Sequence, residues 1–257
     1  MSLLSFLSLP YSNWIVKRNK KWINNPLIFQ ERIFKELVRS AQNTAFGQDH
    51  SFDKIQSYDD YKKHVPVRDY EALKPYIERV IGGEQNVLWK GKPLYFTKTS
   101  GTTSGTKYIP ISKSSMPFHL RGAREALLSY INETKDTSFL KGKTIFIQGS
   151  PHLDYVNGIP TGRLSGIVAH HLPWYLKLNN LPSFKTNCIE DWEKKIDAIV
   201  DETINKPMSL ISGIPPWVQM YFEKINKRTG KTISEVFPNY SLFVFGGVNF
   251  KPYKNRF

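Results

Sequence analysis

Short apolar runs alternate with helix-forming stretches in the second half of the chain, and this alternation constrains the fold most strongly. The runs lie at residues 144–147, 208–211 and 242–245. Between them, residues 191–204 and 215–227 place apolar side chains three and four positions apart, which is typical of a helix with one buried face. Strands that alternate with helices build α/β folds. We therefore predict an α/β chain with mixed sheets flanked by helices. The helix at 191–204 is expected to turn four residues inward: Trp192, Ile196, Ile199 and Val200.

The first half of the chain predicts mainly helices. Asn25 and Pro26 suit the cap and the first turn of one helix. The expected apolar face of that helix consists of Leu27, Phe34, Leu37, Val38 and Ala41. Three more helices are expected, at residues 58–64, 69–80 and 113–132. The segment 150–187 is rich in Pro, Gly and Asn without a clear period, and it predicts loops and short elements.

The size of the chain allows one large domain or two smaller ones with a substantial core. Of its 257 residues, 40% are hydrophobic and 14% aromatic, so a disordered chain is excluded. No internal repeat or low-complexity linker is present, so one continuous domain over residues 1–257 is expected. Residues 250–257 resemble the start of another helix, so the sequence is expected to be a fragment of a longer protein.

The charge is strongly basic. The chain has 36 Lys and Arg against 22 Asp and Glu, a formal net charge of +14. Such a surface favours acidic partners such as phosphates, nucleic acid or anionic lipid. A solvated, lysine-rich surface without a binding role is an equal alternative.

Cysteine content and hydropathy limit the cellular compartments in which the chain is expected. The single cysteine, Cys188, excludes an intrachain disulfide and a cysteine-cluster metal site, and it suits the reducing cytoplasm. No run approaches the ~20 apolar residues of a membrane span. Residues 1–10 are apolar, but cations follow rather than precede them, which argues against a signal peptide. This segment is expected to pack on the domain, with a surface-membrane anchor as the alternative.

Residues 99–107 carry the densest chemical signal. They read Thr-Ser-Gly-Thr-Thr-Ser-Gly-Thr-Lys and lie between β-prone runs at 94–97 and 108–111. Glycines let the backbone approach a ligand closely, and hydroxyl and N–H groups can donate to phosphate oxygens. Lys107 adds a positive charge. The sequence therefore predicts a strand, a triphosphate-binding loop and a second strand.

The spacing excludes two other phosphate motifs. Three residues separate Gly101 from Gly105 where a P-loop has four, and Tyr108 follows Lys107 where a P-loop has Ser or Thr. The G-x-G-x-x-G dinucleotide pattern is absent. A flexible polar hairpin remains the alternative.

Residues 95–110, YFTKTSGTTSGTKYIP, resemble the phosphate-binding motif of adenylate-forming enzymes. Three further blocks agree: residues 61–70 (YKKHVPVRDY), 211–217 (ISGIPPW) and 237–253. Within that superfamily the chain most resembles the auxin-responsive promoter family, the acyl acid–amido synthetases of plants and their bacterial relatives. The likeness spans nearly the whole chain.

The resemblance implies ATP-dependent activation of a carboxylic acid, with magnesium, followed by amide formation with an amino acid. It implies that the chain is the N-terminal portion of the large domain of such an enzyme. The family's acidic motif, its ribose-binding aspartate and its mobile C-terminal domain would then follow Phe257. The 257-residue chain alone is expected to bind ATP weakly and to catalyse nothing. The nucleotide-binding residues implied are Thr99, Ser100, Gly101, Thr102, Thr103, Ser104, Gly105, Lys107, Gly246 and Gly247.

Three other residues are candidates for the acyl substrate. Arg121 and Arg124 can pair with its carboxylate, although solvent exposure is the favoured alternative. Trp217 can line the acyl pocket or belong to the core. Gly246 and Gly247 can equally form a tight turn after a buried strand. No metal site is predicted, because the histidines lack the spacing of metal ligands.

Two other functions remain open. One is a catalytically inactive member of the same family that binds ATP or another ligand. The other is a basic nucleic-acid-binding module, which is disfavoured because the cations are scattered and the helix at 190–202 is mostly acidic. The acyl substrate, the amino acid and the oligomeric state are not encoded in any recognisable motif.

Overall fold

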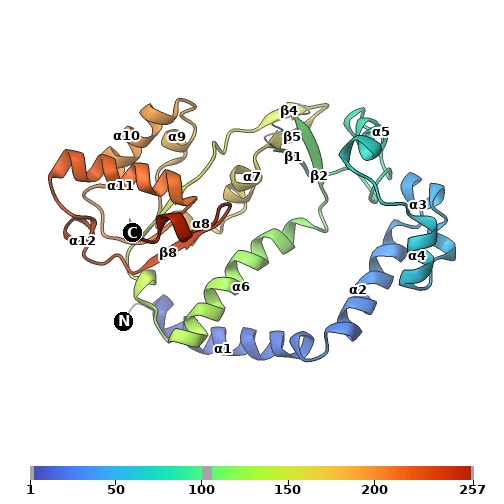
Figure 1. The fold of residues 1–257 in the computed structure, drawn as a ribbon, viewed down its shortest axis with the longest axis horizontal. Coiled ribbons are helices and arrows are strands. Elements are labelled where there is room, and N and C mark those ends of the chain that lie inside the picture. The colour runs from blue at the N-terminus through green and yellow to red at the C-terminus, as the bar shows by residue number, and fades with distance from the viewer. Residues whose placement is uncertain (1–2, 100–105, 256–257) are drawn as a thin grey trace. The chain divides into compact units, whose positions relative to one another are not determined.

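The computed structural model describes residues 3–99 and 106–255, and it combines helices with two four-stranded sheets (Figure 1). The chain divides into two units. Unit 1 comprises residues 1–15, 124–152 and 168–257, and unit 2 comprises residues 16–123 and 153–167. Three helices run from one unit into the other: α1 (Leu3–Ile23), α6 (Met116–Thr134) and α7 (Leu164–His170).

The sheet of unit 2 contains the strands on either side of the predicted loop. Strands β1 (Tyr95–Thr99) and β2 (Lys107–Ile111) pair antiparallel, which confirms the predicted order of strand, loop and strand. β5 (Ile159–Gly162) pairs parallel with β1, and β4 (Asp154–Val156) pairs antiparallel with β5, so the order is β2-β1-β5-β4. The fully buried Phe96 of β1 packs with three other buried residues of this unit: Val80, Val87 and Ile159.

Helices form the first part of unit 2, close to the predicted positions. They are α2 (Pro26–Ala41), α3 (Ala45–Asp49), α4 (Tyr58–His64) and α5 (Tyr70–Ile81), with a 3-10 turn, η1 (Phe52–Lys54). Local hydrogen bonds set where α3, α4 and α5 begin, because a side chain accepts from a backbone N–H of each first turn. The accepting residues are Thr44, Ser57 and Asp69.

The predicted apolar face of α2 is only partly buried. Val38 and Ala41 are buried and Phe34 is half-buried, whereas Leu27 and Leu37 are 76% and 51% exposed. Leu27 lies about three turns before Val38, and Leu37 lies about 100° around the helix from it. Neither therefore reaches the cluster that covers the end of α2.

Unit 1 contains a parallel four-stranded sheet in the order β6-β3-β7-β8. The strands are β3 (Lys143–Ile147), β6 (Asn180–Leu181), β7 (Met208–Gly213) and β8 (Leu242–Phe245). Neighbouring residues of β7 join different core clusters. Ile211 packs with buried residues of α10 (Trp192–Thr203) and α11 (Pro215–Thr229), and Leu210 packs with buried residues of α6. Helices thus cover both faces, as a parallel sheet requires.

The inward face of α10 is confirmed. Ile196, Ile199 and Val200 are fully buried, and Trp192 packs partly against the same cluster. The prediction that β8 is buried is wrong for its second half, because Val244 and Phe245 are 37% and 46% exposed. β8 is the last strand of the described sheet and pairs with β7 on one side.

Short elements complete unit 1. Two of them, α8 (Trp174–Lys177) and α9 (Phe184–Asn187), lie within residues 150–187, where short elements are predicted. The others are η2 (Ser138–Leu140), α12 (Ile233–Val236) and η3 (Lys251–Tyr253). The expectation of a further helix from residue 250 is not met within the described residues. Tyr253 and Lys254 donate to carbonyls three residues back, and these bonds define a 3-10 turn.

The apolar N-terminal segment forms most of the first half of α1, which the sequence did not predict. The expected packing of residues 1–10 is met only in part, because Leu9 packs partly against a core cluster, whereas Phe6 and Leu7 are 62% and 52% exposed. Ile15, beyond that segment, is fully buried in the same cluster as Leu128 and Ile131 of α6. Ser5, Ser8 and Ser12 are also buried, while Trp14 is 56% exposed. Among the helices of the described residues, none combines the length and apolarity needed to cross a membrane.

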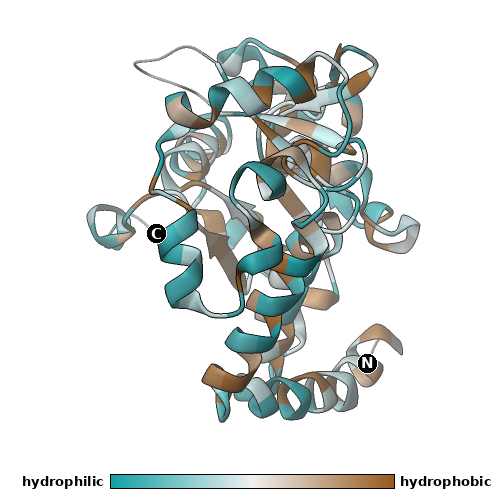
Figure 2. Ribbon diagram, turned by 90° about the vertical axis from the view of Figure 1, so that its right-hand side faces the viewer, coloured by the Kyte–Doolittle hydropathy of each residue, from teal (hydrophilic) through white to brown (hydrophobic). Residues whose placement is uncertain are grey.

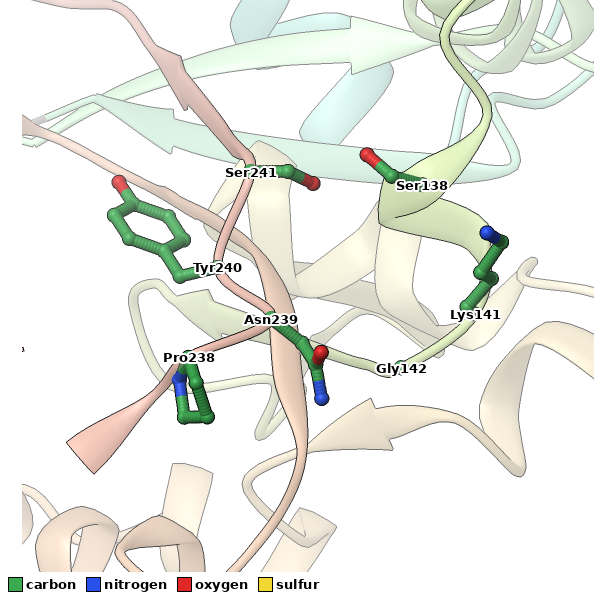
Figure 3. Close-up of a pocket in the computed structure, with 7 residues that line it drawn as sticks. All are labelled: Ser138, Lys141, Gly142, Pro238, Asn239, Tyr240 and Ser241. Atoms are coloured by element: carbon green, nitrogen blue, oxygen red, sulfur yellow. The ribbon is translucent and has the colours of Figure 1, made fainter. Parts of the chain in front are cut away.

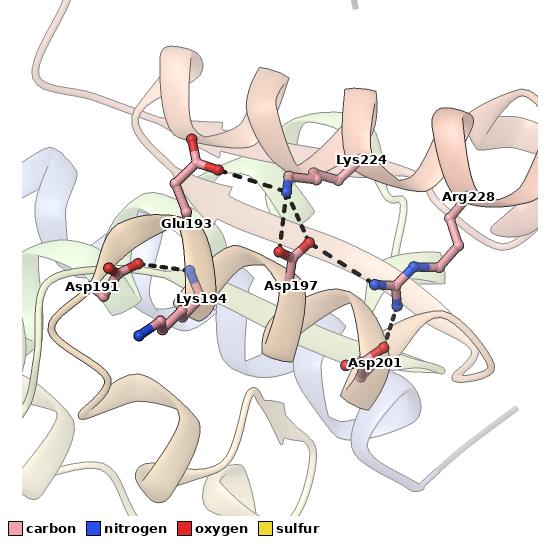
Figure 4. A network of polar contacts seen from close by, with 7 residues as sticks. All are labelled: Asp191, Glu193, Lys194, Asp197, Asp201, Lys224 and Arg228. Atoms are coloured by element: carbon pink, nitrogen blue, oxygen red, sulfur yellow. Dashed lines mark hydrogen bonds and ion pairs between the residues drawn. The ribbon is translucent and has the colours of Figure 1, made fainter.

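Ion pairs join α10 to α11 on the surface of unit 1 (Figure 4). Lys224 Nζ lies 2.9 Å from Asp197 Oδ1, and Arg228 pairs with Asp197 and Asp201. Helices of the chain carry both hydrophilic and hydrophobic residues, as the teal and brown colouring in Figure 2 shows. Three acidic residues of α10, Glu193, Asp197 and Asp201, are therefore paired with cations of the same unit.

Ile199→Ala in α10 is expected to lower the free energy of unfolding by about 2–5 kcal/mol, because it leaves a cavity in a fully buried cluster. Urea unfolding followed by circular dichroism measures this change. Leu178→Ala is the matched control, since Leu178 is 67% exposed in the same unit. A comparable loss in the control would contradict the described core.

Candidate functional site

The strands β1 and β2 hold the two ends of the predicted phosphate loop at adjacent positions. Thr99 is the last residue of β1 and is paired in register with Lys107, the first residue of β2. Directly paired residues point to the same side of a sheet, so this hydroxyl and this ammonium group share one face. The predicted loop residues Ser100, Gly101, Thr102, Thr103, Ser104 and Gly105 lie outside the described residues.

Side chains of unit 2 hold both arms of this hairpin. Lys98 Nζ donates to Asp154 Oδ2 at 2.5 Å, which ties β1 to β4. Lys107 Nζ lies 5.2 Å from the centre of the Tyr70 ring, and the Tyr70 hydroxyl accepts a hydrogen bond of 2.9 Å from the Tyr108 N–H. The cation at the start of β2 thus has a defined neighbour.

Residues 61–70 anchor Tyr70 to the helical part of unit 2. An Arg68 guanidinium N–H donates to Nε2 of the buried His50 at 2.7 Å. Because arginine only donates, His50 Nε2 accepts, and its Nδ1–H is left to donate to the Phe46 carbonyl at 2.7 Å. The His50 ring also stacks on the Phe46 ring, 4.1 Å between centres. The segment leading into α5 is therefore fixed two residues before Tyr70.

Gly246 and Gly247 follow the end of β8 in unit 1. The carboxyl ends of parallel strands are where α/β proteins place ligands. Gly247 has a φ of 84°, and a Cβ there would lie 3.1 Å from Ile214 Cγ2, whereas a Cβ on Gly246 would meet no atom within 4 Å. A turn alone accounts for Gly247. It does not account for Gly246, whose role at a ligand stays a prediction.

The other predicted site residues, Trp217, Arg121 and Arg124, are each described by their own surroundings. The Trp217 ring lies tilted against Trp192 with ring centres 4.5 Å apart and packs against the core of unit 1. Arg121, in unit 2, lies 5.1 Å from the centre of the Phe118 ring, and Arg124 belongs to unit 1. Both arginines are exposed. Contact of these three residues with an acyl substrate remains a prediction.

The histidines have structural surroundings. His170 Nε2 lies 2.8 Å from the Pro151 carbonyl. Burial lowers the pKa of His171, with His170 and Lys177 acting in the same direction. Over residues 3–99 and 106–255, no three His, Cys, Asp or Glu side chains gather in a way that could hold a metal ion.

Unit 1 also contains a cavity of about 330 Å³ at the end of the sheet where β3 and β8 begin (Figure 3). It is lined by two segments: residues 138, 141 and 142, and residues 238–241. Gly142 N donates to Ser209 Oγ at 3.2 Å, and burial raises the pKa of the Tyr240 hydroxyl. None of the predicted site residues lines this cavity.

A family model described as "GH3 family N-terminal domain" matches residues 16–190, more than half of the chain. The chain belongs to the GH3 family. This confirms the resemblance to the acyl acid–amido synthetases that the motifs indicate.

Curated relatives of this GH3 chain are plant enzymes. Indole-3-acetic acid-amido synthetase GH3.2 of Arabidopsis thaliana is 31% identical over 86 residues, 33% of this chain and 16% of that protein. Jasmonoyl--L-amino acid synthetase JAR4 of Nicotiana attenuata is 24% identical over 136 residues, 52% of this chain and 23% of that protein. The matched parts are thus less than a quarter of each relative.

A solved structure shows the same fold. AtGH3.15 acyl acid amido synthetase in complex with 2,4-DB superposes with a TM-score of 0.67 at 15% identity. The match covers 88% of this chain and 42% of that one. The predicted fold class is therefore confirmed, and the GH3 chain spans about two fifths of the solved relative.

Two residues of this GH3 chain stand out only in the structure. Tyr70 lies in a block that the sequence singled out, but nothing in the sequence shows that it contacts β2. Lys195 is 3% exposed, and its ammonium donates to the carbonyls of Gln148 at 2.9 Å and Asn187 at 2.6 Å. A lysine on the apolar face of α10 is the only sequence signal for that buried contact.

Gly247→Ala is expected to lower the free energy of unfolding by about 1–2 kcal/mol, because an L-residue is strained at a φ of 84° and its methyl group would crowd Ile214. Gly246→Ala is the matched control and is expected to change it by less than about 0.5 kcal/mol. Thermal unfolding of both variants measures the difference. Equal losses would contradict the described turn.

Proposed function

We propose that this chain provides the phosphate-binding part of an ATP-dependent acyl acid–amido synthetase. The observation that carries the proposal is the pairing of Thr99 with Lys107, the two residues that flank the segment rich in Gly, Ser and Thr. Membership of the GH3 family and the names of its relatives support it.

The described flanks fit a triphosphate. Lys107 is half-buried with its ammonium group 5.2 Å from the centre of the Tyr70 ring, and the exposed residue Thr99 adds a hydroxyl on the same face. A cation and hydroxyl donors are the groups that phosphate oxygens require. From their sequence, Ser100, Gly101, Thr102, Thr103, Ser104 and Gly105 are proposed to contribute further hydroxyl and N–H donors.

Magnesium is proposed to accompany the nucleotide. This ion keeps several water molecules and is commonly held by one or two carboxylates together with substrate phosphates. The described residues, 3–99 and 106–255, offer no cluster of three acidic or imidazole ligands. When bound with the nucleotide, the ion would add to the charge neutralisation that Lys107 provides, and the hydroxyl residues of segment 99–107 would be this chain's candidates to meet it.

The proposed reaction joins a carboxylic acid to an amino acid at the expense of ATP. The carboxylate oxygen attacks the α-phosphorus and pyrophosphate leaves; the amine nitrogen then attacks the acyl carbon and AMP leaves. The chain's contribution to the first step is to hold the departing phosphates and neutralise their charge. Gly246, Gly247, Arg121, Arg124 and Trp217 remain candidates for contacts to nucleotide and acyl group. The proposed compartment is the cytoplasm.

Lys107→Gln is expected to weaken ATP binding by about tenfold or more, because it removes a charged donor to phosphate. Isothermal titration calorimetry with ATP and magnesium measures the dissociation constant. Lys113→Gln is the matched control, since it removes the same charge from an exposed residue beyond the other end of β2.

The outcome separates the proposal from its alternatives. A tenfold loss in Lys107→Gln alone supports a phosphate site at this loop. Equal losses in both variants would indicate binding by overall charge and would contradict the proposal, as would unchanged binding in Lys107→Gln. Binding of ATP without pyrophosphate exchange for any of a panel of carboxylic acids, when both are measured on a full-length form of the protein, would favour an inactive family member.

A further inference from the structure

Tyr70 connects the helical part of unit 2 to the second arm of the phosphate loop. It is the first residue of α5, and Asp69 before it accepts a hydrogen bond of 2.9 Å from the Ala72 N–H. From this position the Tyr70 side chain reaches β2, 38 residues further along the chain. Its contacts there involve both the ring and the hydroxyl.

We propose that Tyr70 is a positioning residue for Lys107, and that it sets where the ammonium group meets the phosphates of the nucleotide. This inference rests on the proposed function, because it concerns the same phosphate site. It adds a residue outside the loop that affects how strongly Lys107 contributes to ATP binding.

The hydroxyl of Tyr70 fixes the backbone next to Lys107. β2 is the outermost strand of the described sheet, with β1 on one side. The Tyr108 N–H donates to the Tyr70 hydroxyl at 2.9 Å, and this hydroxyl in turn donates to the Tyr108 carbonyl at 3.4 Å. One side chain thus satisfies both backbone groups of a residue at the open edge, as a neighbouring strand would.

The ring of Tyr70 locates the ammonium group itself. Lys107 Nζ lies 5.2 Å from the ring centre, within the distance at which a cation is attracted to an aromatic face. A lysine side chain has four flexible bonds, and holding it near its working position lowers the entropy lost on binding. The ring therefore reduces the cost of placing this cation against phosphate.

Tyr70 is itself held in place. Arg68, two residues earlier, bonds to the buried His50, and the Tyr108 ring packs edge-on against the buried Phe96 of β1 at 6.1 Å. Both partners in the contact are thus attached to separate clusters of unit 2. A rigid support on each side is what a positioning contact needs.

The test measures ATP dissociation constants for two variants of Tyr70 in the full 257-residue chain. Tyr70→Phe keeps the ring and loses the hydroxyl, and is expected to weaken ATP binding about threefold. Tyr70→Leu loses both contacts and is expected to weaken it about tenfold. Tyr76→Phe is the matched control: it lies on the same helix, and its hydroxyl donates to Asp49 Oδ2 at 2.7 Å, away from β2. It is expected to change the constant by less than twofold.

A double-mutant cycle separates positioning from general stability. If Tyr70 acts through Lys107, Tyr70→Leu is expected to weaken binding less than twofold when Lys107→Gln is already present. The unfolding temperature of each variant is measured alongside. Should Tyr70→Leu fail to fold, the same cycle is run with Tyr70→Phe, whose threefold effect must likewise disappear in the Lys107→Gln background.

The two proposals fail in different ways. If the unaltered chain binds ATP and Lys107→Gln weakens it, but both Tyr70 variants bind normally, the positioning role is overturned and the phosphate site stands. Equal losses with and without Lys107→Gln would show a structural effect and also overturn it. If neither the unaltered chain nor any variant binds ATP, the proposed function fails and the inference fails with it.

Discussion

The antiparallel pairing of β1 with β2 is the constraint on which the candidate site depends. It places Thr99 opposite Lys107 and so fixes both ends of the segment that carries the glycines and hydroxyls. A segment whose ends are fixed has less conformational entropy to lose when it closes on a ligand. The same composition in an unattached chain would only be a flexible polar loop. The pairing of β1 with β2 is therefore what distinguishes residues 99–107 from a flexible polar loop of the same composition.

The pairing is supported from outside the hairpin. Phe96 buries the centre of β1, Lys98 ties β1 to β4 through Asp154, and Tyr70 satisfies the outer edge of β2. Tyr70 is in turn fixed through the contact of Arg68 with His50. The helices before the loop are thus more than an N-terminal extension of the sheet. Through Tyr70 they hydrogen-bond backbone groups at the outer edge of β2, where no further strand pairs in the described sheet. This contact gives a physical reason for the family likeness of residues 61–70.

Local features made much of the fold predictable, and long-range contacts account for what was missed. The helix at 58–64 matches α4 because Ser57 and Asp60 cap it through their own hydrogen bonds. The strand at 242–245 was placed correctly, but its burial was not, because burial depends on its edge position in the sheet. Residues 99–107 identified a candidate site from spacing alone. The contact of Tyr70 with Lys107 joins residues far apart in the sequence, so only the fold reveals it.

The basic charge of the chain also acquires a more specific meaning. Glu193, Asp197 and Asp201 of α10 are paired with Lys224 and Arg228 of α11, so part of the acidic charge is already engaged within unit 1. Exposed lysines such as Lys113 contribute to a diffuse field that salt screens. Lys107 differs because a ring holds its ammonium group and a paired strand fixes its backbone. The net charge of +14 therefore does not indicate where a phosphate would bind, whereas a cation held in one position, such as Lys107, indicates a specific candidate place.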